Sequence, residues 1–169
     1  MLIIQEINII KYNINMLDIE DFKNKLDKKS RLMGIDPGRK RVGIAICDEN
    51  KIVATPYTTI IKNKYSDFIK EIKKIIDENQ IKGIIIGNPI NMDGSPSQSS
   101  QSAKDLAINL SKDVTENITL WDERLSSQGA FNLSNDLASN VSNRVKRLDQ
   151  NSAQFILQGA IDYLTKENT

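Results

Sequence analysis

The chain has no histidine among its 169 residues, and this absence narrows the chemistry open to it. Imidazole is the usual proton acceptor near neutral pH and a member of most catalytic triads, so the sequence excludes both roles. Carboxylates that hold a hard divalent cation are the main alternative. We therefore expect any catalysis by this chain to run through Asp and Glu side chains and a metal ion.

Cysteine and long apolar runs are also scarce. Cys47 is the only cysteine and has no partner within the chain, which fits a reducing cytoplasm. No stretch approaches the roughly 20 apolar residues that cross a bilayer. Polar residues interrupt residues 1–10, and a basic leader and a small-residue cleavage site are missing, which argues against a signal peptide. We expect a cytoplasmic protein without a membrane partner.

Net charge is close to balance, at +1, so the chain lacks the global basic field of many nucleic-acid binders. Basic residues do gather locally at 25–31, 39–41 and 144–147. The first cluster is most simply a solvated surface. The second and third lie within a few residues of Asp36 and Asp149. Positive charge beside carboxylates suits a phosphodiester substrate, whose phosphates attract Lys and Arg.

The length corresponds to about one domain. Residues 1–15 are rich in Ile and Asn without a clear period, which indicates an extension, and Met16 is a plausible alternative start. Residues 17–28 allow a short amphipathic helix. We expect residues 1–30 to be an N-terminal extension, partly helical or disordered, and residues 31–169 to form a single domain.

Apolar periodicity predicts an α/β fold. The expected strands are residues 32–36, 42–47, 52–57, 82–87 and 118–121. The expected helices are residues 66–77, with Ser66 as N-cap, 102–112, 126–138 and 149–166, with 139–147 as a mobile loop. Short separations favour an antiparallel meander for the first three strands. Alternating helices and strands then predict a five-stranded mixed sheet with helices on both faces.

Three acidic residues, far apart in the sequence, lie at the ends of these elements. Asp36 ends the first expected strand, Glu123 follows the fifth, and Asp149 begins the last helix. Three carboxylates so placed can converge on a divalent cation. We therefore take all three as candidate metal ligands.

Asp36 lies in a turn sequence, Asp-Pro-Gly, which by itself needs no function. Gly34, Gly38 and Gly43 reduce the side-chain bulk around the acid, which would let a phosphate or a nucleic-acid backbone approach. The spacing matches neither the dinucleotide fingerprint nor a Walker loop. A functional role for Asp36 therefore depends on further site residues elsewhere in the chain.

Glu123 and Asp149 have structural explanations as well, because acids near a helix start can serve only the helix dipole. Adjacent residues that leave a strand point to opposite sides, so only one of Asp122 and Glu123 should face Asp36. Asp149 precedes the apolar stripe of the last helix at roughly helical spacing. An acid at the edge of such a face usually needs a partner or a metal.

Several residues are candidates for substrate binding. Asn88 follows the fourth expected strand, where loop residues commonly form the wall of a site. Arg124 could clamp a phosphate or pair with an acid. The full set expected to contact substrate is Gly38, Arg39, Lys40, Asn88, Arg124, Arg144 and Arg147.

The motifs together resemble the YqgF/RuvX family of pre-16S rRNA nucleases, also called Holliday-junction-resolvase-like proteins. The motifs are Gly-Ile-Asp-Pro-Gly at 34–38, the later Gly43, Ile-Gly-Asn-Pro at 86–89, Asn-Met-Asp-Gly at 91–94, Asp-Glu-Arg-Leu-Ser-Ser at 122–127 and Asp-Gln-Asn-Ser-Ala at 149–153. They run from about residue 32 to residue 164, in the family's order and spacing. The asparagine and glutamate motifs together are more specific than either acid alone.

The resemblance implies an RNase H-like fold and a cytoplasmic nuclease that helps mature the 5′ end of 16S rRNA during ribosome assembly. It implies a requirement for Mg²⁺ or Mn²⁺, and it places the family's acidic positions on Asp36, Glu123 and Asp149. Related resolvases carry a glutamate at the end of the fourth strand, where this chain has Gly87-Asn88-Pro89, so Glu123 from the fifth strand must substitute. After the first acid, Gly38-Arg39-Lys40 stands where other members often have Gly-Thr-Lys.

The expected reaction is metal-dependent hydrolysis of a phosphodiester, with Asp36 as a bridging ligand if two ions are present. Three alternatives remain open. They are a nuclease for DNA junctions, a nucleotide-binding relative of sugar kinases, which normally needs two such domains, and an assembly factor that binds pre-rRNA without cutting it. The expected partner is pre-16S rRNA, with structured DNA as the alternative. The sequence leaves the oligomeric state and the number of metals open.

Overall fold

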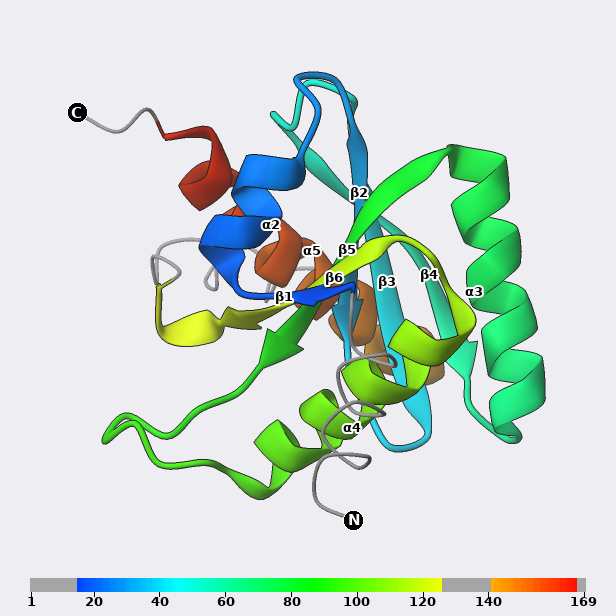
Figure 1. Ribbon diagram of the computed structural model, residues 1–169. Coiled ribbons are helices and arrows are strands. Elements are labelled where there is room, and N and C mark those ends of the chain that lie inside the picture. Colours follow the sequence, from blue (N-terminus) through cyan, green and yellow to red (C-terminus); the bar gives the residue numbers. More distant parts are fainter. Residues whose placement is uncertain (1–14, 126–140, 167–169) are drawn as a thin grey trace, which may run out of the picture.

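A six-stranded mixed sheet forms the centre of the protein (Figure 1). The computed structural model describes residues 15–125 and 141–166, and side chains in 15–125 and 151–166. The strands are β1 (Met16–Leu17), β2 (Arg31–Asp36), β3 (Arg41–Cys47), β4 (Ala54–Ile61), β5 (Ile81–Asn88) and β6 (Asn117–Asp122). They lie in the order β1-β6-β5-β2-β3-β4. β2, β3 and β4 form the expected antiparallel meander, whereas β2, β5, β6 and β1 run parallel.

Helices cover both faces of the sheet, as expected. They are α2 (Ile19–Lys25), α3 (Tyr65–Asn79), α4 (Gln98–Asp113), the short 3₁₀ helix η1 (Glu123–Leu125) and α5 (Val141–Thr165). α3 and α4 pack on one face, and α2 and α5 pack on the other. β5 is buried between these layers, since Ile84 and Ile86 join the first core and Ile85 joins the second. Among the described residues, no helix is both long and apolar enough to span a bilayer.

Residues 15–30 pack against the sheet. The side-chain Nδ2 of Asn15 donates hydrogen bonds to the carbonyls of Val114 and Glu116, at 3.0 and 2.9 Å. β1 then pairs with β6, and Phe22 of α2 is fully buried in the second core. This pairing adds a sixth strand to the expected five. The division of the chain at residue 31 stays a prediction.

Three sequence-based boundaries were wrong. The third strand begins at Ala54 rather than 52, because the Asp48 carboxylate accepts hydrogen bonds from the amides of Ile52 and Val53 and holds them in the turn. α3 begins at Tyr65 after Lys64, so Ser66 is not its N-cap. α4 begins at Gln98 and is capped by Ser97, four residues earlier than expected.

The expected loop at 139–147 was also wrong, because α5 begins at Val141. Val141, Val145 and Leu148 recur at helical spacing, a signal obscured by the basic residues between them. The last helix is therefore longer than the predicted 149–166. The helix expected at 126–138 lies outside the described residues.

Candidate metal and nucleic-acid site

The parallel strands bring the candidate residues to one end of the sheet. Asp36 is the last residue of β2, Asn88 the last of β5, and Glu123 immediately follows β6. Carboxyl ends of neighbouring parallel strands meet at the same edge. The fold therefore places Asp36, Asn88 and Glu123 together, although long stretches of sequence separate them.

Asp36 lies on the sheet face that α5 covers. Leu32 belongs to the core beneath α5, and a Cβ placed on Gly34 would lie 2.6 Å from Leu157 Cβ. Side chains alternate along a strand, so residues 32, 34 and 36 share this face. Trp121 of β6 belongs to the same core. Asp36 and Glu123 thus approach the site from the α5 side.

Glu123 is half-buried beside Asp36. Burial raises the pKa of its carboxyl above the ordinary value, and the negative charges of Asp36 and Asp122 raise it further. Two neighbouring carboxylates in a partly dehydrated site repel each other, and a bound cation would remove that repulsion. Glu123 is therefore a candidate ligand for a cation.

Asp122 is instead satisfied by a neighbouring arginine. Arg124 Nη2 lies 2.7 Å from Asp122 Oδ2, and Arg124 Nε donates to Oδ1 at 3.0 Å. These hydrogen bonds, led by the side-chain pair, hold the pKa of Asp122 below its ordinary value. Only one of the two adjacent acids was expected to face Asp36, and the arrangement favours Glu123 for that role.

The third acid, Asp149, lies within α5, one turn before Ala153. The Ala153 carbonyl oxygen is 3.1 Å from a Cβ placed on Gly34, so α5 crosses β2 two residues before Asp36. The side chains of Asp149, Arg144 and Arg147 lie outside the described residues. Within the side chains that the structure does describe, no three Asp, Glu, Cys or His residues form a metal-binding group.

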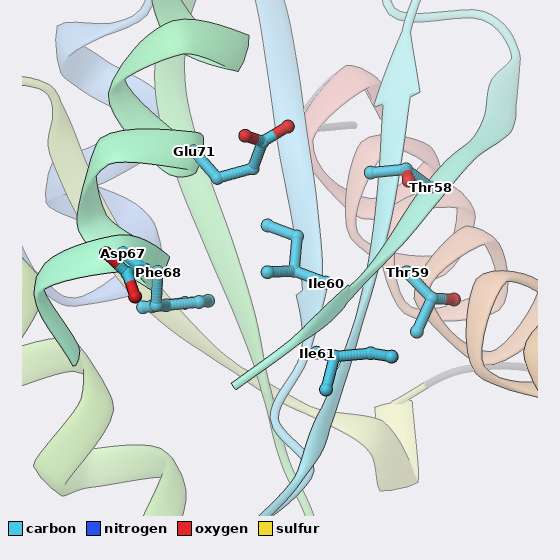
Figure 2. A pocket seen from close by; sticks show the side chains of 7 residues that line it. All are labelled: Thr58, Thr59, Ile60, Ile61, Asp67, Phe68 and Glu71. Carbon is cyan, nitrogen blue, oxygen red and sulfur yellow. The ribbon is translucent and has the colours of Figure 1, made fainter. Parts of the chain in front are cut away.

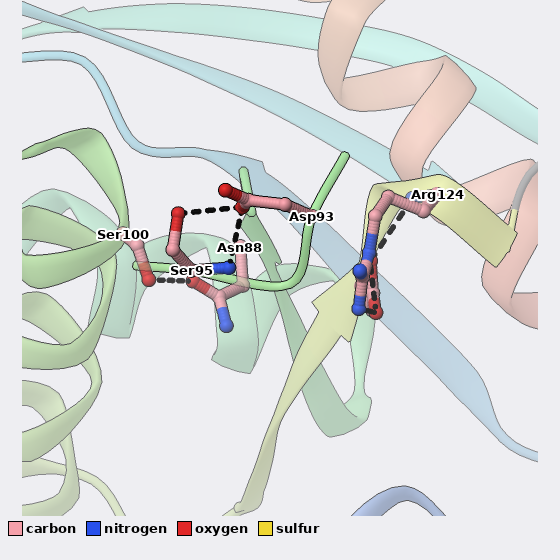
Figure 3. A network of polar contacts seen from close by, with 6 residues as sticks. Asn88, Asp93, Ser95, Ser100 and Arg124 are labelled. Atoms are coloured by element: carbon pink, nitrogen blue, oxygen red, sulfur yellow. Dashed lines mark hydrogen bonds and ion pairs between the residues drawn. The ribbon is translucent and has the colours of Figure 1, made fainter. Parts of the chain in front are cut away.

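Asn88 is mostly buried and connects β5 to α4. Its Oδ1 accepts a hydrogen bond from Ser100 Oγ at 2.8 Å (Figure 3). Ser97 caps the same helix by accepting from the Ser100 amide at 3.0 Å, and its own hydroxyl donates to the Pro89 carbonyl at 2.6 Å. Neither serine was predicted from the sequence, although a serine just before an apolar helical period is a recognisable N-cap signal.

The loop between β5 and α4 folds toward Arg124. Asp93 accepts hydrogen bonds from the hydroxyl and amide of Ser95, which hold its pKa below the ordinary value, with a smaller contribution from Arg124. Gly94 has a φ of 85°, which favours glycine, and Arg124 Nη1 lies 3.5 Å from the place of its missing Cβ. Arg124 thus binds Asp122 and also lies close to Gly94 of this loop, a link that was not predicted from the sequence.

The basic turn after Asp36 is exposed. A Cβ on Gly38 would lie 1.9 Å from the Arg41 carbonyl oxygen, so only glycine fits this turn. Arg39 and Lys40 are solvent-exposed, and Arg39 lines a cavity of about 310 Å³ together with Pro37, Gly38, Gln98, Ser99 and Ser102. Glycine at position 38 therefore has a steric explanation, and the predicted substrate contacts of Gly38, Arg39 and Lys40 stay predictions.

A second cavity of about 310 Å³ lies between β4 and α3 (Figure 2). Thr58, Thr59, Ile60, Ile61, Asp67, Phe68 and Glu71 line it. It contains none of the expected site residues, and β4 is at the opposite edge of the sheet from β1 and β6.

Comparison with known proteins agrees with the geometry. The profile of a family described as "RuvX: Holliday junction resolvase" matches residues 30–163. The chain belongs to the RuvX family. The resemblance seen in the motifs is thereby confirmed, and the observed sheet order fits the RNase H-like architecture that it implied.

Two similar proteins from bacteria share one name. A Pelagibacter ubique protein named "Putative pre-16S rRNA nuclease" is 56% identical over 149 residues, which cover 88% of this chain and 99% of that protein. A Novosphingobium aromaticivorans protein of the same name is 40% identical over 144 residues, covering 85% and 92%. Among solved structures, Thermus thermophilus RuvC in complex with a Holliday junction substrate aligns with a TM-score of 0.49 at 9% identity, over 77% of this chain and 91% of that one.

Proposed function

We propose that this chain is a metal-dependent endonuclease that acts in the cytoplasm on the 5′ end of pre-16S rRNA. One observation carries the proposal: the half-buried Glu123 carboxylate lies beside Asp36 at the carboxyl end of three parallel strands. Membership of the RuvX family and the names of its relatives supply the substrate class.

The donor set fits Mg²⁺ or Mn²⁺. Both ions prefer oxygen ligands, and Asp36 and Glu123 offer carboxylates whose mutual repulsion a cation would relieve. Asp149 would complete the set from α5. A bound ion of this kind lowers the pKa of water and stabilises negative charge on a phosphate.

The remaining residues hold and orient the substrate in this proposal. Arg39 and Lys40 are exposed beside Asp36 and would contact phosphates of the RNA strand. Arg144 and Arg147 would add contacts from α5. Arg124 already forms an ion pair with Asp122. We therefore assign it two roles, which are to position the loop at 91–96 and to contact a phosphate of the substrate. Asn88 would act mainly by holding α4, since its Oδ1 is bonded to Ser100.

Replacement of the central acid tests the proposal. We expect Asp36→Asn to fold normally and to lose metal-dependent cleavage of a pre-16S rRNA fragment. The loss should exceed about 10–100-fold, which is the effect of removing a residue that only supports a metal ligand. Cleavage should be mapped with Mg²⁺, with Mn²⁺ and with a chelator, at matched ionic strength. Full activity of Asp36→Asn would remove this residue from the mechanism.

The family description supports a second candidate, a nuclease for four-way DNA junctions. Parallel assays of a junction and an rRNA precursor separate the two, because the same Asp36→Asn change should abolish whichever reaction is genuine. If the parent and Asp36→Asn both bind RNA and neither cleaves it, the chain is instead an assembly factor.

A further inference from the structure

We propose that Gly87 is a positioning residue for Glu123, because its missing side chain leaves the space through which that carboxylate reaches across β5 toward Asp36. The inference rests on the proposed function, since it assigns Glu123 to the same site as Asp36. It identifies a residue that carries no chemistry of its own.

The sheet order creates the need for such a path. β5 lies between β2 and β6, so Asp36 and Glu123 come from strands two positions apart. Neighbouring strands are separated by about 4.8 Å, which puts the two backbones roughly 10 Å from each other. A carboxylate from the end of β6 must therefore extend over β5 to influence Asp36.

Residue 87 stands on that path. Ile35 pairs with Ile86, and continuing the register sets Gly87 beside Asp36, while Trp121 pairs with Gly87 from the other side. Since Ile85 faces α5, Gly87 faces it too. Any side chain at 87 would project between the two acids.

The contacts show that Glu123 uses this space. A Cβ on Gly87 would lie 2.7 Å from Glu123 Oε1, and 2.5 Å from Cδ1 of Ile156 on α5. Both distances are below 3.0 Å, which is closer than a Cβ atom approaches other heavy atoms in real structures. Both atoms are also the far ends of flexible side chains, so a methyl group would displace them without moving the backbone. Gly87→Ala should therefore fold, but with Glu123 pushed away from Asp36.

Gly83 provides a matched control on the same strand and face. A Cβ on Gly83 would lie 2.7 Å from Phe22 Cζ, so Gly83→Ala also introduces a clash within the second core. It lies near the start of β5, away from Asp36. A general loss of packing affects both variants, whereas a loss of positioning affects only Gly87→Ala.

The two clashes at residue 87 can be separated. Ile156→Val removes Cδ1, so the double variant Gly87→Ala/Ile156→Val keeps the conflict with Glu123 and reduces the conflict with residue 156 to the milder 3.1 Å contact of Cγ1. We expect it to recover thermal stability relative to Gly87→Ala without recovering function. Ile156→Val alone should retain the activity of the parent.

Three measurements on the full chain test the inference: thermal unfolding, calorimetric titration with Mn²⁺, and kcat and KM for an rRNA precursor fragment. We expect Gly87→Ala to lose about 10–100-fold in Mn²⁺ affinity and in kcat, the range for lost positioning of a metal ligand, with KM within about twofold. Gly83→Ala should retain both values below its melting temperature. Parent-like Mn²⁺ affinity and kcat in Gly87→Ala, or their restoration by Ile156→Val, would overturn the inference.

Crystal structures of the parent and Gly87→Ala separate this inference from the proposed function. If the parent neither binds Mn²⁺ nor cleaves RNA, the proposed function fails, and the position of Glu123 still decides the steric claim. A displaced Glu123 carboxylate in the variant supports that claim, and an unchanged one refutes it.

Discussion

At the scale of single residues, Glu123 illustrates how a site can oppose the stability of its own fold. Its carboxyl pKa is raised by burial and by Asp36, so the charged form is less favourable in the folded chain than in the unfolded one. A raised pKa gives a stabilising contribution at low pH that is lost as the pH rises through the folded value. At neutral pH without metal, Glu123 therefore destabilises the fold.

Glu123→Gln should reverse that effect. Without divalent cations, we expect the variant to melt at a higher temperature than the parent at pH 8. The difference should disappear as the pH falls below the ordinary carboxyl value of 4.5. Differential scanning calorimetry across this range measures it, with the exposed Glu78→Gln as control. A Glu123→Gln variant no more stable than the parent at pH 8 would show that the burial is not costly.

The residue scale also shows what the sequence could not predict. The positions of Asp36 and Glu123 at strand ends follow from their apolar runs. Their approach to each other depends on the space left by Gly87. The sequence does not reveal this, because Gly83, which faces the Phe22 ring, and Gly87, which faces the Glu123 carboxylate, are both glycines within one strand. Likewise, Arg124 binds Asp122 rather than Glu123, through hydrogen bonds that the sequence permits but does not predict.

At the scale of elements, the start of α4 holds one wall of the site. Ser97 caps the helix, and Ser100 joins it to Asn88 at the end of β5. Ser100→Ala leaves the buried Asn88 oxygen without this partner, which costs about 1–3 kcal/mol. For a protein of this size we expect the melting temperature to fall by about 2–4 °C per kcal/mol.

The exposed neighbour Ser99→Ala is the matched control for that prediction and should melt within a degree or so of the parent. Equal melting temperatures for the Ser99 and Ser100 variants would show that the link to β5 is weak.

Strands and helices differed in how well the sequence located them. Five strands were found within a few residues of their observed positions because each is a short run rich in apolar, aromatic or β-branched residues. β1 was missed because two residues carry no period, and the strand exists through long-range contacts such as those of Asn15. The start of α5 was misplaced because charged residues outnumber the apolar ones in its first two turns.

At the scale of the whole molecule, near-neutral net charge means that RNA binding must depend on local basic groups. Arg39 and Lys40 follow the end of β2 that carries Asp36, whereas Lys28 and Lys29 precede the opposite end. We expect Arg39→Ala/Lys40→Ala to weaken binding of single-stranded pre-rRNA. The slope of log affinity against log salt should fall by about 1.4, that is about 0.7 per lost phosphate contact.

Fluorescence anisotropy over a series of salt concentrations measures that slope. Lys28→Ala/Lys29→Ala removes the same charge from the far end of the sheet and should leave it unchanged. An equal fall in both double variants would mean that the RNA responds to total charge rather than to the site.

The origin of the acid pair has a consequence for the newly made chain. The meander that carries Asp36 is complete once residue 61 has been synthesised, yet its acidic neighbour arrives only with residue 123. A nascent polypeptide emerging from the ribosome therefore contains Asp36 well before Glu123 has been added to it. If the pair cuts RNA, the chain stays harmless to the ribosome that is translating it until most of its own message has been read.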